Sequence, residues 1–307
     1  MSAFIPRLAL VLQAVISAGT FLVAKDATEH LTPGQLAWFR IVCSAVCVTP
    51  LYFLSRRPRT LPARRDLLRF ALLGFLGVTA NQTLFLEGIH LSGAINAALL
   101  YSFTPALVLL LAVLFLGEKL SAAKIGGVVL AIAGVLLVLS AKGLAPTKGT
   151  LGDALILAAV VAWSAYTLGG KGLLRRHDAF TVIAWTFWFG ALSILLATPW
   201  ALAGLDAGAV PLRAWLGVLY LSLMTSVVSY VLWYWALRSM DASQVAIFGN
   251  LQAPFTALLA WAFMGDVPGL AVIGGGTLVL LGVTLVQRPA ARRESVESAP
   301  PGGVPKR

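Results

Sequence analysis

Arg40 has the most unusual setting of any residue in this sequence, because it is the only charge within the stretch Leu36–Leu54. An arginine placed in a membrane span costs at least about 2.5–3.5 kcal/mol, so it is a functional hypothesis by default. Its guanidinium suits a carboxylate or phosphate of a bound solute, or a gate fixed through Glu87. The alternative is that its side chain reaches the outer lipid headgroups.

A second group of candidate site residues is polar or aromatic, uncharged, and placed inside apolar runs. Amides and phenols in lipid need partners, so we expect these side chains to face the protein interior. Each one alone is more often an interhelical hydrogen bond than a ligand contact. Together they indicate a cavity with aromatic walls that suits a small polar or amphipathic solute. The residues are Gln13, Ser17, Asn81, Gln82, Tyr101, Trp163, Tyr166, Tyr230 and Asn250.

The sequence offers little for other chemistry. The acids Glu87, Glu118, Asp153 and Asp266 all fall near the ends of apolar runs, so no carboxylate is expected at mid-membrane depth. The phosphate-binding pattern G-x-x-x-x-G-K-[ST] is absent, which leaves ATP without support as an energy source. We therefore expect neither an enzyme nor a metal or cofactor site.

The composition places the candidate residues in a membrane protein. Hydrophobic residues make up 59% of the chain and charged residues 11%, against about 25% charged in an ordinary soluble domain. Runs such as Ala97–Leu116 are long enough to cross the hydrocarbon core as helices. The net charge of +11 does not indicate a nucleic-acid partner, because the cations are confined to short loops and the tail. The expected partners are a small-molecule substrate and the lipid bilayer.

Ten membrane-spanning helices are predicted from the apolar runs and the turn residues between them. Most of the 23 lysines and arginines then lie on one side, which predicts cytoplasmic N- and C-termini. The first span also has features of a cleaved signal peptide, but its Ser17 has a counterpart in Ser164 of the sixth span. The predicted spans are Leu8–Ala24, Leu36–Leu54, Leu67–Leu86, Ile95–Leu116, Ile125–Ala141, Ala154–Gly170, Phe180–Leu202, Trp215–Leu237, Val245–Met264 and Leu270–Val286.

The chain contains an internal duplication. The stretch Ser92–Glu118 returns as Asp241–Asp266, and the prolines Pro105 and Pro254 are 149 positions apart. Five spans per half is an odd number, so the second half enters the membrane in the opposite sense. The fold class is therefore an all-α membrane protein with ten transmembrane helices arranged as two inverted five-helix repeats.

Four segments and two residue pairs follow from the duplication. Residues 5–141 form the first repeat, 142–150 a linker loop, 151–288 the second repeat and 289–307 a disordered cytoplasmic tail. Pro105 and Pro254 are expected to kink their helices at equivalent depth. Glu118 and Asp266 are expected to be acids at helix ends.

These features resemble the EamA family of the drug/metabolite transporter superfamily, in its ten-helix form. The resemblance is carried by the doubled S-x-A-x-x-A…P…G-[ED] pattern, the glycine-rich fifth and tenth spans, Lys25 closing the first span, and Arg40 within W-F-R. The second copy departs from the pattern, with Gly265-Asp266 where Gly-Glu is more usual and L-Q-A-P where L-x-P is commoner. The resemblance implies transport of a small metabolite without ATP, by alternating access, in a bacterial-type inner membrane.

Substrate and direction stay open at this point. Export of an amino-acid-type solute is our first expectation, and it rests on the resemblance alone. The alternatives are import of a sugar or nucleotide-type solute, and a non-transporting membrane scaffold or lipid-pathway protein. The glycine-rich fifth or tenth helix also offers a homodimer contact. Trp200, Trp215 and Trp233 lie near predicted span ends, where interfacial tryptophans are common.

Overall fold

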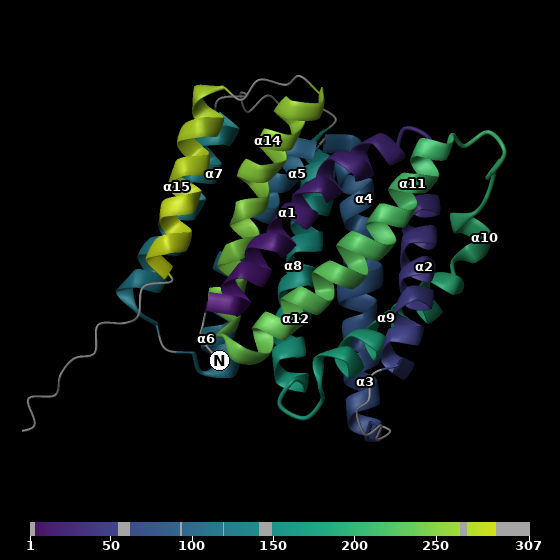
Figure 1. Ribbon diagram of the computed structural model, residues 1–307, viewed down its shortest axis with the longest axis horizontal. Helices are drawn as coiled ribbons and strands as arrows, with labels where there is room; N and C mark the ends of the chain where they lie inside the picture. Colours follow the sequence, from purple (N-terminus) through teal and green to yellow (C-terminus); the bar gives the residue numbers. More distant parts are fainter. Residues whose placement is uncertain are drawn as a thin grey trace, which may run out of the picture.

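The chain folds into a bundle of helices, and no strand occurs in the residues that the structure describes. This computed structural model describes residues 4–54, 62–92, 94–118, 120–140, 149–264 and 269–286 (Figure 1). Asp266, residues 142–148 of the predicted linker and the tail 289–307 lie outside the described residues.

The described helices divide between the two halves of the chain. The first half contains α1 Phe4–Ala27, α2 Pro33–Leu54, α3 Arg64–Leu73, η1 Gly74–Ala80, α4 Asn81–Ser92, α5 Ala94–Tyr101, α6 Thr104–Leu116 and α7 Ala122–Ser140. The second contains α8 Gly149–Leu173, α9 Ala179–Leu195, α10 Thr198–Ala201, α11 Leu212–Tyr220, η2 Leu221–Val228, α12 Ser229–Ser239, α13 Ala242–Ala246, η3 Ile247–Leu251, α14 Gln252–Met264 and α15 Leu270–Val286. Here η1 and η2 are π-helices and η3 is a 3₁₀-helix.

Six helical stretches are long and apolar enough to cross a membrane. They are Ile5–Ala27, Pro33–Leu54, Arg64–Ser92, Gly149–Leu173, Leu212–Ser239 and Ala242–Phe263. Four shorter apolar helices accompany them: Thr104–Leu116, Ala122–Gly134, Ala179–Leu195 and Ile273–Gly282. Large apolar side chains face outward, with Phe263 81% and Leu270 89% exposed, as expected of a surface in contact with lipid. The start of α1 and the end of α15 lie at the same end of the bundle (Figure 1).

Local signals explain where several helices begin and end. Asp178 precedes α9, and its carboxylate accepts hydrogen bonds from the backbone N–H groups of Phe180 and Thr181 at 3.0 and 3.3 Å. Gly117 ends α6 in the left-handed conformation, with φ of 68°, which glycine adopts without steric cost. Glu118 follows Gly117 directly and so lies just after the end of α6.

The two prolines lie at breaks in their helices. Pro105 stands in the first turn of α6, and the turn at Ser102 and Phe103 separates α6 from α5. Pro254 is the third residue of α14, which follows the 3₁₀ segment η3. A proline lacks the backbone N–H that a helix interior needs, so a helix starts most readily at the proline itself. The predicted kinks are thus changes of helix type or short turns.

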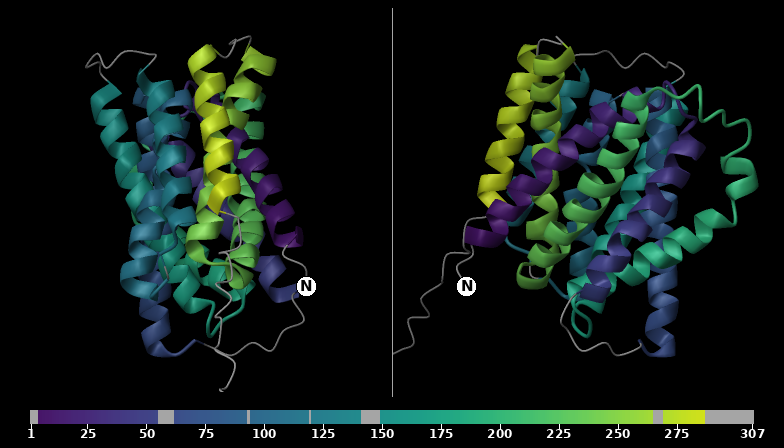
Figure 2. Two further views of the ribbon diagram at one scale, coloured as in Figure 1. Left: turned by 90° about the vertical axis from the view of Figure 1, so that its left-hand side faces the viewer. Right: turned by 45° about the vertical axis from the view of Figure 1, so that its right-hand side comes forward.

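The two halves of the chain pack mainly against each other. α7 packs on α15, α4 on α8, α2 on α9, and α1 on both α12 and α14. Figure 2 shows α15 beside α7 at one end of the bundle. Each of these pairs joins one half to the other, so the core sits between the repeats and neither half encloses a core alone.

The small-residue faces of α7 and α15 are used within the chain. A Cβ added at Gly282 would lie 2.5 Å from the carbonyl oxygen of Gly127 and 3.1 Å from Cβ of Ala131. The glycines therefore allow the two helices to approach closely. A homodimer through these helices stays a prediction, and it would have to use their other faces.

The duplication reappears in two matched pairs of features, the π-helices and a lysine near the end of the first helix of each half. The π-helices η1 and η2 begin at Gly74 and Leu221, which are 147 positions apart. Lys25 and Lys171, which are 146 apart, each lie in the last turn of the first helix of their half. Lys25 donates to the carbonyl oxygen of His90 at 3.1 Å, and Lys171 donates to those of Leu237 and Met240, both at 2.6 Å.

Three sequence predictions need correction. Trp233 is 1% exposed and packs in the core, because its helical stretch continues to Ser239 and leaves it away from the end; Trp200, in contrast, is 78% exposed. α9 ends at Leu195, short of the predicted Leu202, because Thr198–Ala201 forms a separate turn with a proline at its start. α8 begins at Gly149, inside the predicted linker.

Candidate functional site

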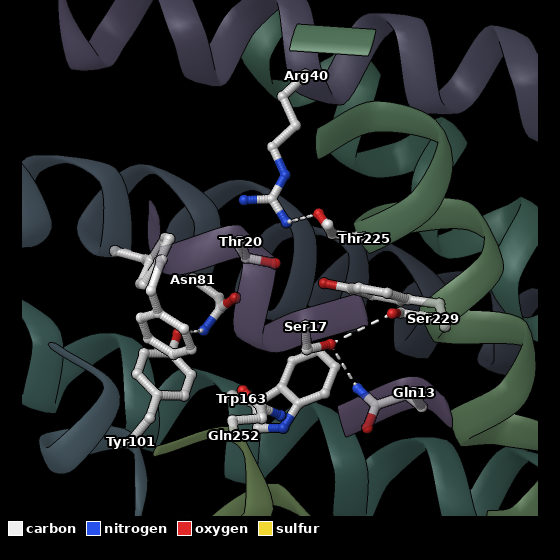
Figure 3. Close-up of a pocket in the computed structure, with 13 residues that line it drawn as sticks. Gln13, Ser17, Thr20, Arg40, Asn81, Tyr101, Trp163, Thr225, Ser229 and Gln252 are labelled. Carbon is white, nitrogen blue, oxygen red and sulfur yellow. Dashed lines mark hydrogen bonds between the residues drawn. The ribbon is translucent and has the colours of Figure 1, made fainter. Parts of the chain in front are cut away.

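A polar cavity lies between the two halves of the bundle. Its walls come from α1, α2, α4 and α5 of the first half and from α8, η2, α12 and α14 of the second (Figure 3). Its volume is about 80 Å³, which holds a few water molecules but is small for a metabolite. The lining residues are Gln13, Ser17, Thr20, Phe21, Arg40, Asn81, Phe85, Tyr101, Trp163, Thr225, Ser229, Tyr230 and Gln252.

Arg40 points from α2 into this cavity (Figure 3) and is only 5% exposed. Its Nε donates to Ser226 Oγ at 3.1 Å, and its Nη2 donates to Thr225 Oγ1 at 3.1 Å. Neither the predicted contact with Glu87 nor a reach to the lipid headgroups fits this geometry. Arg40 therefore belongs to the protein interior.

The hydroxyls that hold Arg40 share one face of the helical stretch Leu212–Ser239, which contains η2 and α12. Ser222, Thr225, Ser226 and Ser229 recur at helical spacing, and all four are buried. Ser44, one turn after Arg40, donates to the carbonyl oxygen of Ser222 at 3.1 Å. The helix α2 is thus tied to η2 at two points, the Arg40 guanidinium and the Ser44 hydroxyl one turn further along.

α1 contributes a polar stripe with the same kind of spacing. Gln13 Nε2 donates to Ser17 Oγ at 2.8 Å, and Ser17 Oγ lies 3.2 Å from Ser229 Oγ on α12. Thr20 continues this face one turn further (Figure 3). The stripe carries hydrogen-bonding groups from the first half of the chain to the second across the cavity.

Asn81 and Tyr101 form the opposite polar corner. Asn81 Nδ2 donates to the Tyr101 hydroxyl oxygen at 2.8 Å and to the carbonyl oxygen of Ala159 at 2.8 Å. The Tyr101 ring packs edge-on against Phe21 and Phe85, with centroid distances of 6.0 and 5.5 Å. This corner therefore joins an amide and a phenol to an apolar aromatic surface.

A second aromatic wall comes from the other half of the chain. The rings of Trp163 and Tyr230 lie 5.1 Å apart and nearly perpendicular, and the Tyr230 hydroxyl donates to the carbonyl oxygen of Gly77 at 3.2 Å. Tyr166 and Trp233 pack against Trp163, each at 5.5 Å. The cavity is thus lined by aromatic rings from both repeats.

Three of the predicted cavity residues are buried elsewhere. Tyr166 is fully buried, and its hydroxyl oxygen lies 3.1 Å from Thr186 Oγ1. Gln82 and Asn250 are 1% and 0% exposed, and their side-chain amides have no hydrogen-bond partner within the described residues. None of the three is among the residues that line the cavity.

Six lining residues were not among the sequence predictions: Thr20, Phe21, Phe85, Thr225, Ser229 and Gln252. For most of them, the spacing in the sequence already indicated that they share a helix face with predicted site residues. Thr20 and Phe21 follow Ser17 at helical spacing, Phe85 follows Asn81 by four residues, and the hydroxyls of the eighth span recur on one face. Gln252 had only the unusual L-Q-A-P sequence as a hint.

One other group of potential ligands lies on the surface. Asp26, Glu29 and His30 bring their ligand atoms within 4.8 Å of one another. Arg213 already occupies this group, because its Nη2 lies 2.6 Å from His30 Nε2 and 3.5 Å from Asp26 Oδ1. Because Arg213 is bound to these side chains, the group gives no indication of a metal site.

The long apolar helices define a multi-pass integral membrane protein, and a polar cavity lies between its two halves. The chain belongs to the EamA-like transporter family, whose sequence profile matches residues 5–140 and 150–288. The resemblance read from the duplicated pattern is confirmed. The family and the apolar helices agree with the predicted location in a bacterial-type inner membrane.

Relatives along nearly the whole chain are named transporters. A protein of Archaeoglobus fulgidus named an uncharacterized transporter is 31% identical over 91% of this chain and 96% of its own. A probable terminal-alkyne amino-acid exporter of Streptantibioticus cattleyicolor is 30% identical over 95% of this chain and 96% of its own. The pseudopaline exporter CntI of Pseudomonas aeruginosa is 25% identical over 91% of this chain and 95% of its own.

A solved structure supports the fold. One crystal structure, described only as that of a protein, matches with a TM-score of 0.74 over 90% of this chain and 96% of its own. Its sequence identity is 18%, so the likeness shows the arrangement of helices alone.

Proposed function

We propose that this EamA-family transporter is a secondary carrier that exports a small amino-acid-type metabolite by alternating access, without ATP. The observation that carries the proposal is the cavity itself, which takes its lining from both halves of the chain. In a carrier built from inverted repeats, the substrate site lies at the interface of the repeats. A scaffold protein has no need of a buried cavity lined by unsymmetrical polar groups.

We propose ten transmembrane helices in two inverted repeats, with both termini in the cytoplasm. The matched π-helices and the matched lysines support the repeat. The odd number of predicted spans per half supports the inversion. The placement of the first and last helix ends at one end of the bundle agrees with it (Figure 1).

The breaks at Pro105 and Pro254 are the proposed points of movement. The first follows a short turn and the second a 3₁₀ segment, and each break lies beside a lining residue, since Tyr101 ends α5 and Gln252 begins α14. Interrupted helices at equivalent depth are typical of the moving or site-lining parts of such carriers. Because the present cavity is smaller than a metabolite, these segments have to rearrange when a solute enters.

The direction and the substrate class rest on the relatives that are named exporters, one of them for an amino acid. The cavity's mixture of uncharged polar groups, aromatic walls and one cation is compatible with an amino acid. Import of a sugar or nucleotide-type solute is the competing expectation within transport.

Purified protein in liposomes tests the proposal. Vesicles are loaded with one unlabelled candidate at a time, and entry of the same labelled solute is followed as counterflow, with and without a pH gradient. Amino acids are screened beside sugars and nucleosides. Counterflow of an amino acid supports the proposal, whereas flux restricted to sugars or nucleosides favours the competing solute classes. No flux for any class transfers the weight to a scaffold or lipid-pathway role.

A further inference from the structure

The charge of the cavity is carried by one residue. Of the 13 lining residues, only Arg40 bears a formal charge, and none is acidic. Its hydrogen-bond partners are the neutral hydroxyls of Thr225 and Ser226, and no carboxylate of the described residues forms an ion pair with it. Among the residues that the structure describes, the cation is therefore buried without a counter-ion.

A buried charge without a partner is costly, and an opposite charge with matching hydrogen bonds is the most effective compensation. Guanidinium carries five N–H donors in a planar fork. Two are engaged by the hydroxyls, and Nη1 makes no hydrogen bond within the described part of the chain. The remaining donors match the two oxygens of a carboxylate.

The charge is also confined to one half of the chain. Trp38 and Trp185 are equivalent in the duplication, so the position equivalent to Arg40 is Phe187. Phe187 is fully buried, and its ring packs on Tyr230 at 5.1 Å. The duplication has thus placed a cation at one position and, at the equivalent position, an aromatic residue that packs behind the lining residue Tyr230.

The cavity lining contains no carboxylate that could pair with a positively charged group of a solute. The rest of the lining consists of amides, hydroxyls and the rings of Phe21, Phe85, Tyr101, Trp163 and Tyr230. Amide oxygens and ring faces are weaker partners for an ammonium than a carboxylate is. The cavity is therefore specialised for an anionic group joined to an apolar one.

Resting on the proposed transport function, we infer that the solute binds through its carboxylate, held by Arg40, and that its ammonium group is dispensable. Its apolar part lies against the aromatic walls. The carrier then selects small amphipathic carboxylates, amino acids included, over the matching amines.

Two matched ligand series test this inference on the purified full-length protein. One series is phenylalanine, 3-phenylpropanoate and 2-phenylethylamine; the other is leucine, 4-methylpentanoate and 3-methylbutylamine. Binding is measured by ligand-induced thermal stabilisation and by tryptophan fluorescence. We expect an acid and its amino acid to bind in at least one series, and the amine to bind at least about tenfold more weakly.

Variants at position 40 complete the test. Arg40→Gln should weaken acid binding by about 10- to 100-fold, and Arg40→Lys should weaken it less, because the charge remains while the fork is lost. Arg213→Gln, at a cation with a 61% exposed side chain, is the control and should bind as the wild type does. Equal size-exclusion profiles and melting temperatures show that the variants are folded.

The outcomes separate this inference from transport. An amine that binds as well as its acid, wild-type affinity in Arg40→Gln, or no binding of either acid overturns the inference. Counterflow of an uncharged solute that is unaffected by Arg40→Gln also overturns it, while leaving transport intact. Carboxylate binding without any flux preserves the inference and removes the transport function.

Discussion

The carboxylate of Glu118 accepts a hydrogen bond from the backbone N–H of Ala242 at 2.8 Å, so the end of α6 caps the start of α13. Glu118 also accepts from Ser243 Oγ at 2.5 Å and from Lys124 Nζ at 3.1 Å. Lys124 reaches Asp241 at 3.3 Å as well. The Glu118 carboxylate thus links the end of α6, in the first half of the chain, to the start of α13, in the second half.

Glu118→Ala should therefore destabilise the protein markedly. The substitution removes a helix cap between the halves and leaves the buried ammonium of Lys124 with Asp241 alone. We expect a loss of about 2–4 kcal/mol, measured as a lower melting temperature of the detergent-solubilised protein. The exposed Glu29 provides the control, because Glu29→Ala should change stability by less than about 0.5 kcal/mol. Equal melting temperatures for the two variants would show that the Glu118 cap does not contribute to the stability of the protein.

Gly77→Ala should be among the most damaging single-methyl additions. A Cβ at position 77 would lie 2.1 Å from Cγ of Tyr166, whose ring is fully buried and cannot move aside. Overpacking of this kind costs about 1–3 kcal/mol or more, and Tyr166 stands behind the Trp163 wall. We expect a lower yield of folded protein and a lower melting temperature.

The control for this prediction is Gly172→Ala. Gly172 lies near the end of α8, and apart from its own chain neighbours and the adjacent helix backbone no atom lies within 4 Å of an added Cβ. Alanine costs less conformational entropy than glycine in a helix, so this variant should be neutral or stabilised by up to about 1 kcal/mol. A destabilised Gly172→Ala, or an unchanged Gly77→Ala, would contradict the packing argument.

The contrast between Asn250 and Gln252 shows where reasoning from the sequence stops. Tyr101 and Asn250 are equivalent in the duplication, which predicts that both face the cavity, and only Tyr101 does. The segment Ile247–Leu251 is a 3₁₀-helix, and it advances by about 120° per residue instead of about 100°. Over five residues the difference is about 100°, which turns Asn250 away from its expected direction and rotates Gln252 towards the cavity. A periodic pattern assumes one helix type, and the sequence does not mark the change.

Other site residues were predictable because their inward orientation depends only on their own type and on the apolar run around them. Arg40, Asn81 and Trp163 are polar or amphipathic side chains inside apolar runs, and such residues turn inward wherever the run crosses lipid. The duplication was visible as a fixed offset, and it indicated that the site lies between the halves. The partners of Arg40 were not predictable, because they depend on how α2 packs against η2 from the other half.

Lys171 and Lys25 hold equivalent positions and should differ in energetic weight. Lys171 donates to two carbonyl oxygens at 2.6 Å in a partly buried setting, whereas Lys25 donates to one at 3.1 Å in an exposed setting. Lys171→Met should cost about 1.5–3 kcal/mol, the range for hydrogen bonds of a charged group. Lys25→Met should cost less than about 1 kcal/mol. Thermal unfolding of both variants, compared in the same detergent, checks the order, and the reverse order would refute it.

Thr225→Val should impair ligand binding without unfolding the protein. The Thr225 hydroxyl accepts from Arg40 Nη2 and donates to the carbonyl oxygen of Leu221. Valine keeps the shape but frees the guanidinium on one side, so carboxylate binding should weaken by about 3- to 10-fold, less than in Arg40→Gln.

Thr167→Val is the matched control for that substitution, because it makes the same chemical change at a buried threonine that does not line the cavity. Thr167 Oγ1 has no hydrogen-bond partner within the described residues. Removing an unsatisfied buried hydroxyl should leave affinity unchanged and stability equal or higher. Titration of both variants with 3-phenylpropanoate and leucine, beside their melting curves, distinguishes the two sites. Equal affinities for Thr225→Val and Thr167→Val would mean that the hydroxyls of η2 do not position Arg40 for its ligand.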